Sequence, residues 1–380
     1  ASFLYNRLKC GNAMKKKILV LGCTGSIGSS TLDIVRRFPD LFSVCGLTAH
    51  TRKTELEKLC KEFSCTNAAV AGNSPDEIRC VIEKSNADIA VNGIAGSAGL
   101  MPSVWCLQNN INLALANKET VVMAGRLIKE LARTKSRKVI PVDSEHSAIF
   151  QCLSGTWNNS VEKIWLTASG GPFRTKTPDE LATVTKEQAL RHPNWNMGAK
   201  VTIDSASMMN KGFEMIEARW LFGLPPERIE VVVHPQSIVH SMVQFADGAV
   251  MAQLGTPDMH LPIAYALAYP HRLRSAAPRL DFAQLSTLTF EAPDRERFRN
   301  LDYAYEAARR GGNMPCILNA ADEVAVAAFL SGKIGFLAMS DLIAGTMART
   351  TFIATPTYDD YVQTDAEARR IATEITGSQK

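Results

Sequence analysis

Between residues 17 and 142, short apolar runs alternate with segments of helical length, and this alternation restricts the fold more than any other feature of the sequence. The apolar runs are expected to be strands, and they are found at residues 18–21, 44–48, 68–71, 89–92, 112–116 and 139–142. Strands separated by helices form βαβ units, which join neighbouring strands into a parallel sheet. The sequence therefore predicts an α/β fold whose N-terminal part is a parallel sheet covered by helices.

A glycine-rich loop follows the first expected strand and opens the first expected helix. It contains Gly22, Gly25 and Gly28, and such glycines permit a tight turn and a close approach of the backbone to a pyrophosphate. The free N–H groups at the start of the helix then suit phosphate oxygens. The spacing is GxxGxxG rather than GxGxxG, but the strand before the loop and the helix after it favour a Rossmann-type dinucleotide site.

The end of the second expected strand indicates which dinucleotide binds. Sites for NAD usually carry an acidic residue about 20 residues beyond the glycine loop, where it binds the ribose hydroxyls. The segment 48–54 contains no acidic residue and instead carries His50, Thr51, Arg52 and Lys53. A basic side chain at Arg52 or Lys53 can pair with a 2′-phosphate, which favours NADPH. The alternative is an ordinary solvated helix start.

Two carboxylates, Asp143 and Glu145, follow the last expected strand of this sheet. If the strand extends to Glu145, both lie on one face of it, because side chains alternate along a strand. If the strand ends at Val142, both lie at a carboxyl end, where open α/β sheets bind ligands. A third interpretation is a strand-to-helix turn with Asp143 or Ser144 as N-cap. Carboxylates this close repel each other unless a cation or a shared proton joins them.

Beyond residue 145 the pattern predicts a second, α+β part with an antiparallel component. Strands are expected at residues 163–167, 230–233, 241–245 and 249–254, and a helix is expected at 204–222. Asp247 and Gly248 stand between the last two strands, which is a strong hairpin signal. A C-terminal helical domain is predicted by helical patterns at residues 303–310, 317–330, 338–349 and 365–375.

Four polar clusters lie in this second part. They are the strand-end loop 169–172, the loop 191–195 with Trp195 as an aromatic lid candidate, the apparent helix start 204–207, and the helical segment 210–214. A helix start at 204–207 offers free N–H groups to an anion. Asn210, Lys211 and Glu214 are three or four residues apart, so they share a helix face. An ordinary surface ion pair is the alternative there, but the helix is largely apolar and its charges need partners.

One arrangement uses all of these residues. Asp143, Glu145 and Glu214 supply three hard oxygen ligands, which suit Mg²⁺ or Mn²⁺ rather than zinc. The residues expected to surround a phosphate are Ser169, Ser205, Asn210 and Lys211. His192 and Trp195 close over the substrate and exclude water. The predicted chemistry is hydride reduction of a phosphorylated carbonyl compound that is held on a divalent metal.

Composition excludes several other classes of function. Lys+Arg 42 against Asp+Glu 38 leaves a net charge of +4, which is too balanced to predict binding to nucleic acid or to a membrane surface. No apolar run approaches the roughly 18 residues that a membrane span needs. The nine cysteines are scattered and form no CxxC pair, which indicates a reducing compartment and argues against a zinc site.

The sequence resembles the 1-deoxy-D-xylulose 5-phosphate reductoisomerase family. The matching motifs are LGCTGSIG (21–28), LANKE (115–119), PVDSEHSAIFQ (141–151), SGGPFR (169–174), RHPNWNMG (191–198), DSASMMNKGFEMIEARWLF (204–222), HPQSIVHSM (234–242) and LNAADEVAVAAFL (318–330). The resemblance implies an enzyme that uses NADPH and Mg²⁺ or Mn²⁺, with Co²⁺ as a further option. The implied reaction isomerises and reduces 1-deoxy-D-xylulose 5-phosphate to 2-C-methyl-D-erythritol 4-phosphate in non-mevalonate isoprenoid synthesis.

The resemblance also implies roles for matching positions. The implied metal ligands are Asp143, Glu145 and Glu214, which form the catalytic group together with Lys118. Lys118, Ser144 and Glu145 are implied to contact the hydroxyl end of the substrate. The implied phosphate shell is Ser169, Ser205, Asn210 and Lys211, with His192 nearby. The implied NADPH contacts are Thr24, Gly25, Ser26, Ile27, Asn117, Glu119 and Gly198. The family often has a Gly-Lys-Asn type segment where this chain has His50-Thr51-Arg52, so the residue that meets the 2′-phosphate is left open.

The expected organisation combines these inferences. The parts are a tag or unstructured leader (1–13), an NADPH-binding Rossmann-like domain (14–143), a catalytic, metal-binding and dimerisation domain (144–269) with a flexible lid near 185–200, a connecting arm (270–300) and a C-terminal helical domain (301–380). The resemblance implies a V-shaped homodimer joined largely through the central domain. The expected location is a bacterial cytoplasm, with a plastid-type organelle as the alternative.

Two other functions are compatible with the glycine loop. A semialdehyde-reducing NADP-dependent dehydrogenase normally uses a catalytic cysteine, or a lysine without a metal, and no cysteine here lies in such a motif. A non-catalytic NADP sensor does not need Asp143, Glu145, Glu214 and Lys211 together. Oxidation of NADPH in the presence of deoxyxylulose phosphate, measured with and without EDTA, discriminates among the three functions.

Overall fold

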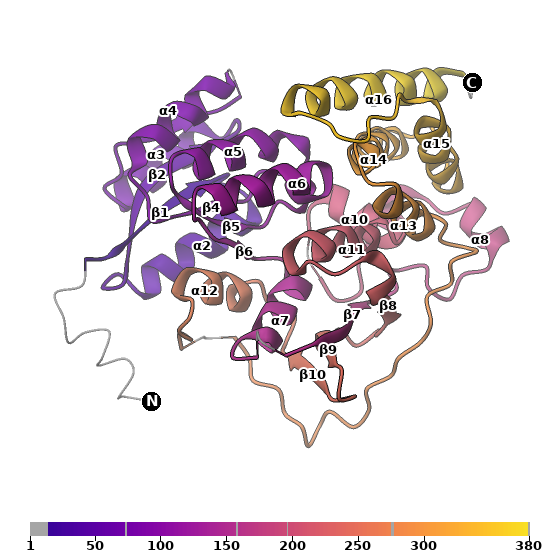
Figure 1. Ribbon diagram of the computed structural model, residues 1–380, viewed down its shortest axis with the longest axis horizontal. Helices are drawn as coiled ribbons and strands as arrows, with labels where there is room; N and C mark the ends of the chain where they lie inside the picture. The colour runs from indigo at the N-terminus through magenta and orange to yellow at the C-terminus, as the bar shows by residue number, and fades with distance from the viewer. Residues whose placement is uncertain (1–13, 73, 157–158, 196, 275–276, 379–380) are drawn as a thin grey trace.

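The computed structural model describes residues 14–378 except 73, 157–158, 196 and 275–276. The expected tag or leader, residues 1–13, lies outside the described residues. Three parts follow one another along the chain: a large sheet with its helices, a smaller sheet with its helices, and a group of C-terminal helices (Figure 1). The mixed α/β fold predicted from the sequence is confirmed.

Among the described residues the first sheet has six strands, and every neighbouring pair is parallel. The strands are β1 (Lys16–Leu21), β2 (Phe42–Ala49), β3 (Ala68–Val70), β4 (Ile89–Asn92), β5 (Asn112–Leu115) and β6 (Val139–Pro141). Their order is β3-β2-β1-β4-β5-β6, the doubly wound order of a Rossmann-type sheet. The direction of winding reverses between β1 and β4, so a ligand crevice is expected at the carboxyl ends of these two strands.

Helices cover both faces of this sheet, which is why its strands are continuous apolar runs. The helices are α2 (Ser26–Arg37), α3 (Lys53–Glu62), α4 (Pro75–Ser85), α5 (Leu100–Gln108) and α6 (Lys118–Thr134). Residues of α4, α5 and α6 pack together on one face. Residues of α2 and α3 pack on the other.

A further helix, α12 (His260–Ala268), packs on the same face as α2. Ile263 and Leu267 join the cluster that contains Leu32, and the Lys16 ammonium donates to the Leu267 carbonyl over 2.8 Å. The chain therefore returns to the first sheet after it has built the second. No helix was expected at 260–268, because this segment is apolar almost all round and shows no amphipathic period.

The second sheet is mixed. Its strands are β7 (Val161–Ala168), β8 (Ile229–Val233), β9 (Val239–Phe245) and β10 (Val250–Leu254), in the order β10-β9-β7-β8. The pair β7–β8 is parallel and the other two pairs are antiparallel. The hairpin predicted at Asp247-Gly248 joins β9 to β10, and Gly248 has a φ of +87° there. The helices of this part are α7 (Ser144–Leu153), α8 (Pro178–Ala182), α9 (Lys186–Ala189), α10 (Ala199–Ala206) and α11 (Met209–Phe222).

The single helix expected at 204–222 is wrong. The segment holds the end of α10 and the whole of α11, separated by Ser207 and by Met208, whose φ is +63°. Residues 204–207 resemble a helix start because they are rich in Asp and Ser, but α10 begins earlier, directly after Gly198. The prediction that these residues offer free helical N–H groups to an anion is therefore wrong as well. Ser205 instead contributes its hydroxyl from the last turn of α10.

Four helices form the C-terminal part as far as the structure describes it, as predicted. They are α13 (Asn300–Arg310), α14 (Met314–Leu330), α15 (Phe336–Arg349) and α16 (Tyr358–Ser378). One apolar core joins α11, through Phe213 and Ile216, to α14, through Ile317 and Leu318. Gly212 lies within α11 because a Cβ there would be 2.5 Å from the Cβ of Ala304 on α13. The C-terminal helices are therefore fixed to the central part by a shared core.

Two further observations concern the chain as a whole. Among the described residues, no helix combines the length and the apolar character needed to cross a lipid bilayer. The eight cysteines in the described part are all free thiols.

Candidate active site

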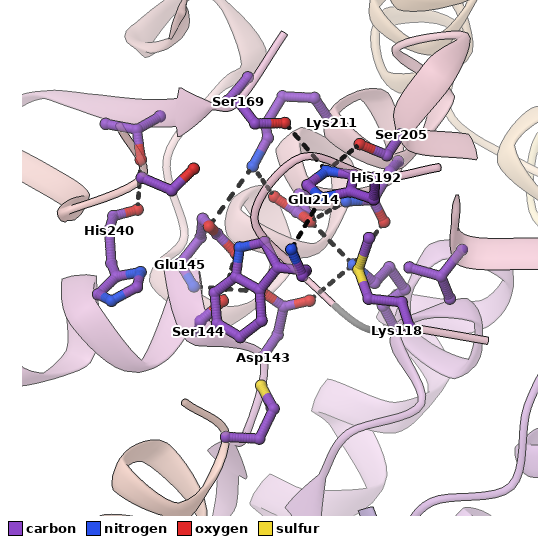
Figure 2. A pocket seen from close by; sticks show the side chains of 18 of the residues that line it. Lys118, Asp143, Ser144, Glu145, Ser169, His192, Ser205, Lys211, Glu214 and His240 are labelled. Carbon is purple, nitrogen blue, oxygen red and sulfur yellow. Dashed lines mark hydrogen bonds and ion pairs between the residues drawn. The ribbon is translucent and has the colours of Figure 1, made fainter. Parts of the chain in front are cut away.

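A cavity of about 220 Å³ lies where the first sheet meets the second. Its walls come from the end of the first sheet, the start of α7, the end of β7, the loop before α10, and α11 (Figure 2). The predicted site residues that line it number fourteen: Ser26, Ile27, Lys118, Asp143, Ser144, Glu145, Ser169, His192, Trp195, Gly198, Ser205, Asn210, Lys211 and Glu214. Residues far apart in the sequence therefore meet in one space.

The two carboxylates after β6 combine the second and third of the interpretations set out above: the strand ends before Asp143, and Asp143 caps a helix at the carboxyl edge of the sheet. β6 ends at Pro141, and Asp143 is the N-cap of α7. Its Oδ1 atom accepts a hydrogen bond from the backbone N–H of Glu145 over 3.2 Å. Capping does not remove these side chains from the site, because the cap lies at the carboxyl edge of the sheet. Asp143 therefore caps a helix with one oxygen and faces the cavity with the other.

A cluster of three carboxylates forms the floor of the cavity. Oxygen atoms of Asp143, Glu145 and Glu214 lie within 4.8 Å of one another. Glu214 reaches them from α11 and is 1% exposed. Such a set of hard oxygen donors fits Mg²⁺ or Mn²⁺, for which carboxylate oxygens are the preferred protein ligands. The structure thus brings together the three residues predicted to bind the metal.

Two lysines enter the carboxylate cluster. The Nζ atom of Lys118 lies 2.6 Å from Oδ2 of Asp143 and 2.9 Å from Oε1 of Glu214. Lys211 pairs with the other oxygen of Glu214 and lies 3.9 Å from Glu145. Once Glu145 is ionised, three carboxylates and two ammonium groups leave a net negative charge, which favours a bound cation.

The charges in this buried cluster shift one another's pKa values. Burial opposes ionisation of Asp143, but Lys118 overcomes it and holds the pKa of Asp143 well below its usual value. Burial likewise opposes the charge on Lys118, but Asp143 and Glu214 raise the pKa of Lys118 well above its usual value. Burial, assisted by the neighbouring carboxylates, raises the pKa of Glu145 to about 8. A nearby cation would favour the ionised form of Glu145.

A group of neutral hydrogen-bonding side chains faces the carboxylates from the other side. The Nε2 atom of His192 lies 3.1 Å from the hydroxyl oxygens of both Ser169 and Ser205. Its Nδ1 atom accepts from the backbone N–H groups of Asn194 and Trp195, so the ring proton is on Nε2. Burial, with the nearby Lys211, lowers the pKa of His192 to about 4, so the ring is neutral near pH 7.

This arrangement can hold a phosphate. Two hydroxyls and an imidazole N–H converge on one point, and the Lys211 ammonium supplies a full positive charge on the same wall. Charge-assisted hydrogen bonds of this kind are the strong ones. Trp195 lies on the side of the cavity next to His240, with the two ring centroids 6.1 Å apart.

A second cavity, of about 730 Å³, adjoins the glycine loop. It is lined by Gly22, Thr24, Gly25, His50, Thr51 and Arg52, all predicted to contact NADPH. Its size suits a dinucleotide. The Arg52 guanidinium donates to the Thr24 carbonyl over 2.9 Å, so this basic side chain lies beside the loop. Lys53 is absent from the described lining.

The glycines of the loop have the geometry that a close approach requires. Gly22 has a φ of +79°, and a Cβ there would lie 3.2 Å from the Gly93 carbonyl oxygen. A Cβ on Gly28 would lie 2.3 Å from the Gly22 carbonyl oxygen, so Gly28 packs the helix against the loop and lines neither cavity. The loop separates the two cavities, since Ser26 and Ile27 face the smaller one.

Two further residues predicted to contact NADPH, Asn117 and Glu119, line neither cavity in the described structure. The Asn117 side chain caps α6, accepting from the Thr120 N–H over 3.0 Å. It also donates to Glu119 over 2.9 Å. Their contacts with NADPH stay predictions.

Sequence reasoning from the residues alone missed several buried charges next to the site. His146 donates from Nε2 to the Glu214 carbonyl over 2.8 Å, and its Nδ1 atom lies 3.3 Å from Asp143 and 3.5 Å from Glu217. Burial opposes its charge, but Glu217 and Asp143 raise the pKa of His146 to about 9. The position of Glu217, three residues after Glu214 on an apolar helix, was a signal that could have identified it. Lys118 was predicted as a site residue only from the resemblance to the family.

Comparison with known proteins agrees with these features. Residues 18–79 and 72–125 match the family described as 1-deoxy-D-xylulose 5-phosphate reductoisomerase. Residues 139–222 and 254–371 match the two C-terminal domains described for DXP reductoisomerases. The 1-deoxy-D-xylulose 5-phosphate reductoisomerase of Bacteroides fragilis is 54% identical over 380 residues, covering 95% of this chain and 98% of that protein.

The chain belongs to the 1-deoxy-D-xylulose 5-phosphate reductoisomerase family. The relative from Porphyromonas gingivalis is 50% identical over 378 residues, covering 94% of this chain and 98% of that protein. The reductoisomerase of Zymomonas mobilis in complex with NADPH superposes with a TM-score of 0.88 at 41% identity, covering 96% of this chain and 99% of that one. A reductoisomerase in complex with NADPH, fosmidomycin and magnesium superposes with a TM-score of 0.90 at 36% identity, covering 95% and 98%.

Proposed function

We propose that this protein is an oxidoreductase that converts 1-deoxy-D-xylulose 5-phosphate to 2-C-methyl-D-erythritol 4-phosphate, using NADPH and a divalent metal. The observation that carries the proposal is a single cavity in which three carboxylates face a phosphate-type shell, next to a dinucleotide-sized cavity. Family membership supports the reaction, and the titles of related structures name NADPH and magnesium. The cofactors are therefore NADPH and Mg²⁺ or Mn²⁺, with Co²⁺ as a further option.

In this proposal, Asp143, Glu145 and Glu214 hold the metal. A divalent cation at this position would polarise the substrate's oxygen atoms and stabilise negative charge that develops on them. The Asp143 cap and the burial of Glu214 fix two of the three ligands before substrate arrives. Preorganised ligands of this kind lose little freedom during the reaction.

Lys118 and Ser144 bind the hydroxyl end of the substrate. The Lys118 ammonium carries protons beside Asp143 and Glu214, so it can donate hydrogen bonds to a substrate oxygen at the cluster. The Ser144 hydroxyl donates to Glu145 over 2.8 Å and can turn toward a ligand. These groups orient the reacting carbons relative to the hydride that NADPH supplies.

The phosphate end of the substrate binds Ser169, Ser205, Asn210, Lys211 and His192. Neutral His192 donates from Nε2, while Lys211 balances the charge of the phosphate. Because Lys211 also pairs with Glu214, the phosphate shell and the metal cluster share one cation. Lys211 therefore sets the distance between the phosphate shell and the metal cluster, and so between the two ends of the bound substrate.

The segment near 185–200, which includes α9, acts as a lid. Trp195 and Gly198 line the cavity from this segment. Closure of such a segment excludes water and strengthens the electrostatic interactions inside the site. We also propose that Asn117, Glu119 and Gly198 contact NADPH. The proposed domain boundaries lie at residues 143, 269 and 300.

The assembly and location are proposals that rest on the family and on surface chemistry. A homodimer joined through the central domain is supported by the edge strand β10, where Val250 and Met251 are 50% and 43% exposed. Light scattering of the purified protein tests this directly. The free thiols support a reducing compartment, the bacterial cytoplasm or, as an alternative, a plastid-type organelle.

The decisive experiment follows NADPH oxidation with 1-deoxy-D-xylulose 5-phosphate, with and without EDTA. Turnover that requires the substrate, ceases on complete removal of metal and returns with Mg²⁺ or Mn²⁺ supports the proposal. Activity that survives metal removal would contradict the metal-dependent mechanism. NADPH binding without any turnover in the presence of metal would favour the sensor.

A further inference from the structure

Two adjacent acidic residues of the C-terminal domain, Asp322 and Glu323, have no part in the function proposed above. They lie on α14 within the motif 318–330, which carried the resemblance without a role. Asp322 is 1% exposed, and a buried carboxylate is retained only where it is paired. Their partners lie in the two parts of the chain that build the two cavities.

Glu323 holds the loop that follows β4. Its Oε1 atom accepts from the backbone N–H of Ser97 over 3.0 Å. Arg369 on α16 lies 2.6 Å from its other oxygen and also donates to the Ser97 hydroxyl over 3.1 Å. The guanidinium is in turn paired with Asp365 at 2.7 Å. Ser97 is thus bound through its backbone and its side chain by the C-terminal domain.

The same loop is held from its opposite side by Asn117. The Gly96 carbonyl accepts from the Asn117 amide over 2.9 Å, and a Cβ on Gly99 would lie 2.5 Å from the Asn117 side chain. Gly96 has a φ of +69°, and a Cβ there would lie 2.9 Å from the Glu323 carboxylate. The loop therefore fits tightly between Glu323 and Asn117, which caps the helix that begins with Lys118.

This loop forms part of the wall of the dinucleotide cavity. Ser97 and Ala98 line it, together with Gly93 and Ile94 directly after β4. The C-terminal helix α16 contributes to the same wall through Tyr358 and Tyr361. The position of the 96–99 loop consequently affects the shape of the cavity, and the partners that hold Ser97 lie in the C-terminal domain.

Asp322 holds the other side of the active site. It lies 2.8 Å from Nζ of Lys200, which lies 2.6 Å from Asp204 and 3.9 Å from Glu119. Burial and the charge of Asp322 raise the pKa of Asp204 well above its usual value. Lys200 and Asp204 belong to α10, whose Ser205 hydroxyl faces the smaller cavity.

We propose that Asp322 and Glu323 are positioning residues through which the C-terminal domain sets the two halves of the active site. Glu323, with Arg369, fixes the 96–99 loop in the shape that NADPH requires. Asp322, through Lys200, fixes α10 and hence the Ser205 hydroxyl of the phosphate shell. The assignment rests on the proposed function, since it takes the larger cavity as the NADPH site and the smaller one as the substrate site. The competing explanation is that both residues only stabilise the fold.

Glu323→Ala tests the cofactor half. NADPH affinity, measured by isothermal titration calorimetry, should fall roughly tenfold, because a partly buried hydrogen bond to a charged group is lost at the loop. Mn²⁺ affinity should stay within about twofold, since the carboxylate cluster is untouched. Glu323→Gln keeps an acceptor for the Ser97 N–H and should recover most of the NADPH affinity. The matched control is Asp341→Asn, which breaks an exposed pair with Arg299 on the same domain.

Asp322→Asn tests the substrate half and should give the opposite pattern. The affinity for inorganic phosphate should fall, and the KM for 1-deoxy-D-xylulose 5-phosphate should rise, each by roughly tenfold. The affinity for NADPH should stay near that of the wild type. A role in stability alone would lower the melting temperature of both variants without separating the two ligands. Unchanged ligand affinities in both folded variants would overturn the inference.

A second variant covers the case in which Glu323→Ala does not fold. Arg369→Met leaves Glu323 in place but frees its carboxylate from the partner that orients it. Arg369→Met should weaken NADPH binding, as Glu323→Ala does. Unchanged NADPH binding in Arg369→Met would also overturn the inference. Wild-type protein that fails to bind NADPH at all would refute the proposed function instead, so the two failures are distinct.

Discussion

The Nζ atom of Lys118 lies 2.6 Å from Oδ2 of Asp143, so an ammonium group from the first domain occupies the same oxygen cluster that fits a divalent cation. Like charges disfavour each other at this separation. Lys118→Met should therefore tighten Mn²⁺ binding by roughly threefold to tenfold, because the competing charge is removed. Turnover should nevertheless fall by roughly 100-fold or more, since a donor that faces the reacting oxygens is lost.

Mn²⁺ titration followed by electron paramagnetic resonance measures the first effect, and steady-state kinetics measures the second. Lys129→Met is the matched control, because Lys129 is an exposed lysine on the same helix. It should change neither quantity. Weaker Mn²⁺ binding in Lys118→Met would mean that Lys118 supports the ligands rather than competing with the metal.

Glu214→Gln tests whether Glu214 contributes to metal binding and not to dinucleotide binding. Glu214 is a ligand candidate in the smaller cavity and is not among the described residues that line the larger one. Loss of its charge should lower turnover by roughly two to three orders of magnitude and weaken Mn²⁺ binding by at least roughly tenfold. NADPH affinity, measured by calorimetry, should stay nearly intact. Glu227→Gln, an exposed residue beyond the end of α11, is the control.

A comparable loss of NADPH affinity in Glu214→Gln would contradict this assignment. It would mean that Glu214 supports the cofactor cavity through α11. An unchanged Mn²⁺ affinity in Glu214→Gln would also contradict the assignment, because it would show that the metal binds without the Glu214 carboxylate.

The sequence predicted those parts of the fold and site that local patterns encode. Alternating apolar runs predicted the parallel sheet, and Asp247-Gly248 predicted the hairpin. The spacing of Asn210, Lys211 and Glu214 placed them correctly on one helix face, where Asn210 donates to Glu214 over 2.6 Å. These features follow from helical and strand periodicity, which a single sequence displays directly.

Features that depend on distant contacts were not predicted from the residues themselves. Met208 has a positive φ at the break between the two helices, but a positive φ is usually indicated in a sequence by glycine, and none is present there. Residues 204–222 therefore resembled one helix. Lys118 reads as an ordinary first residue of a helix, and only its distance to Asp143 and Glu214 shows why it is buried. Lys200 and Asp322 are 122 residues apart, and no local pattern predicts that they meet.

Arg52→Asp tests the choice of cofactor. The Arg52 guanidinium lies at the larger cavity beside Thr24, which suits a 2′-phosphate, the group that distinguishes NADPH from NADH. The variant should raise the KM for NADPH by roughly 10- to 100-fold and that for NADH by much less. Steady-state kinetics with both cofactors provides the measurement.

Lys53→Asp is the informative comparison for Arg52, because it makes the same change of charge one residue away. Lys53 begins α3 and is not among the described residues that line the cavity, so its effect should be small for both cofactors. Equal effects of Arg52→Asp on NADPH and NADH would refute the 2′-phosphate contact. A larger effect from Lys53→Asp would transfer that contact to Lys53.

His240 makes the stability of the fold depend on pH. Burial lowers the pKa of His240 to about 4, and the nearby Lys211 and His234 act in the same direction. An unfolded histidine has a pKa of about 6.5. Between these values the unfolded chain binds a proton that the folded protein does not bind, so stability falls as the pH decreases from about 6.5 to 4.

This dependence should be reduced in His240→Gln. Urea unfolding at pH 7 and pH 4.5 should show that the wild type loses about 2 kcal/mol more than the variant over this range. The comparison uses the change with pH in each protein, so any constant cost of replacing a buried histidine cancels. His271→Gln, at an exposed histidine, should behave as the wild type. Parallel losses in the wild type and His240→Gln would show that the folded protein accommodates a charged His240, and that acid instability has its source in other groups.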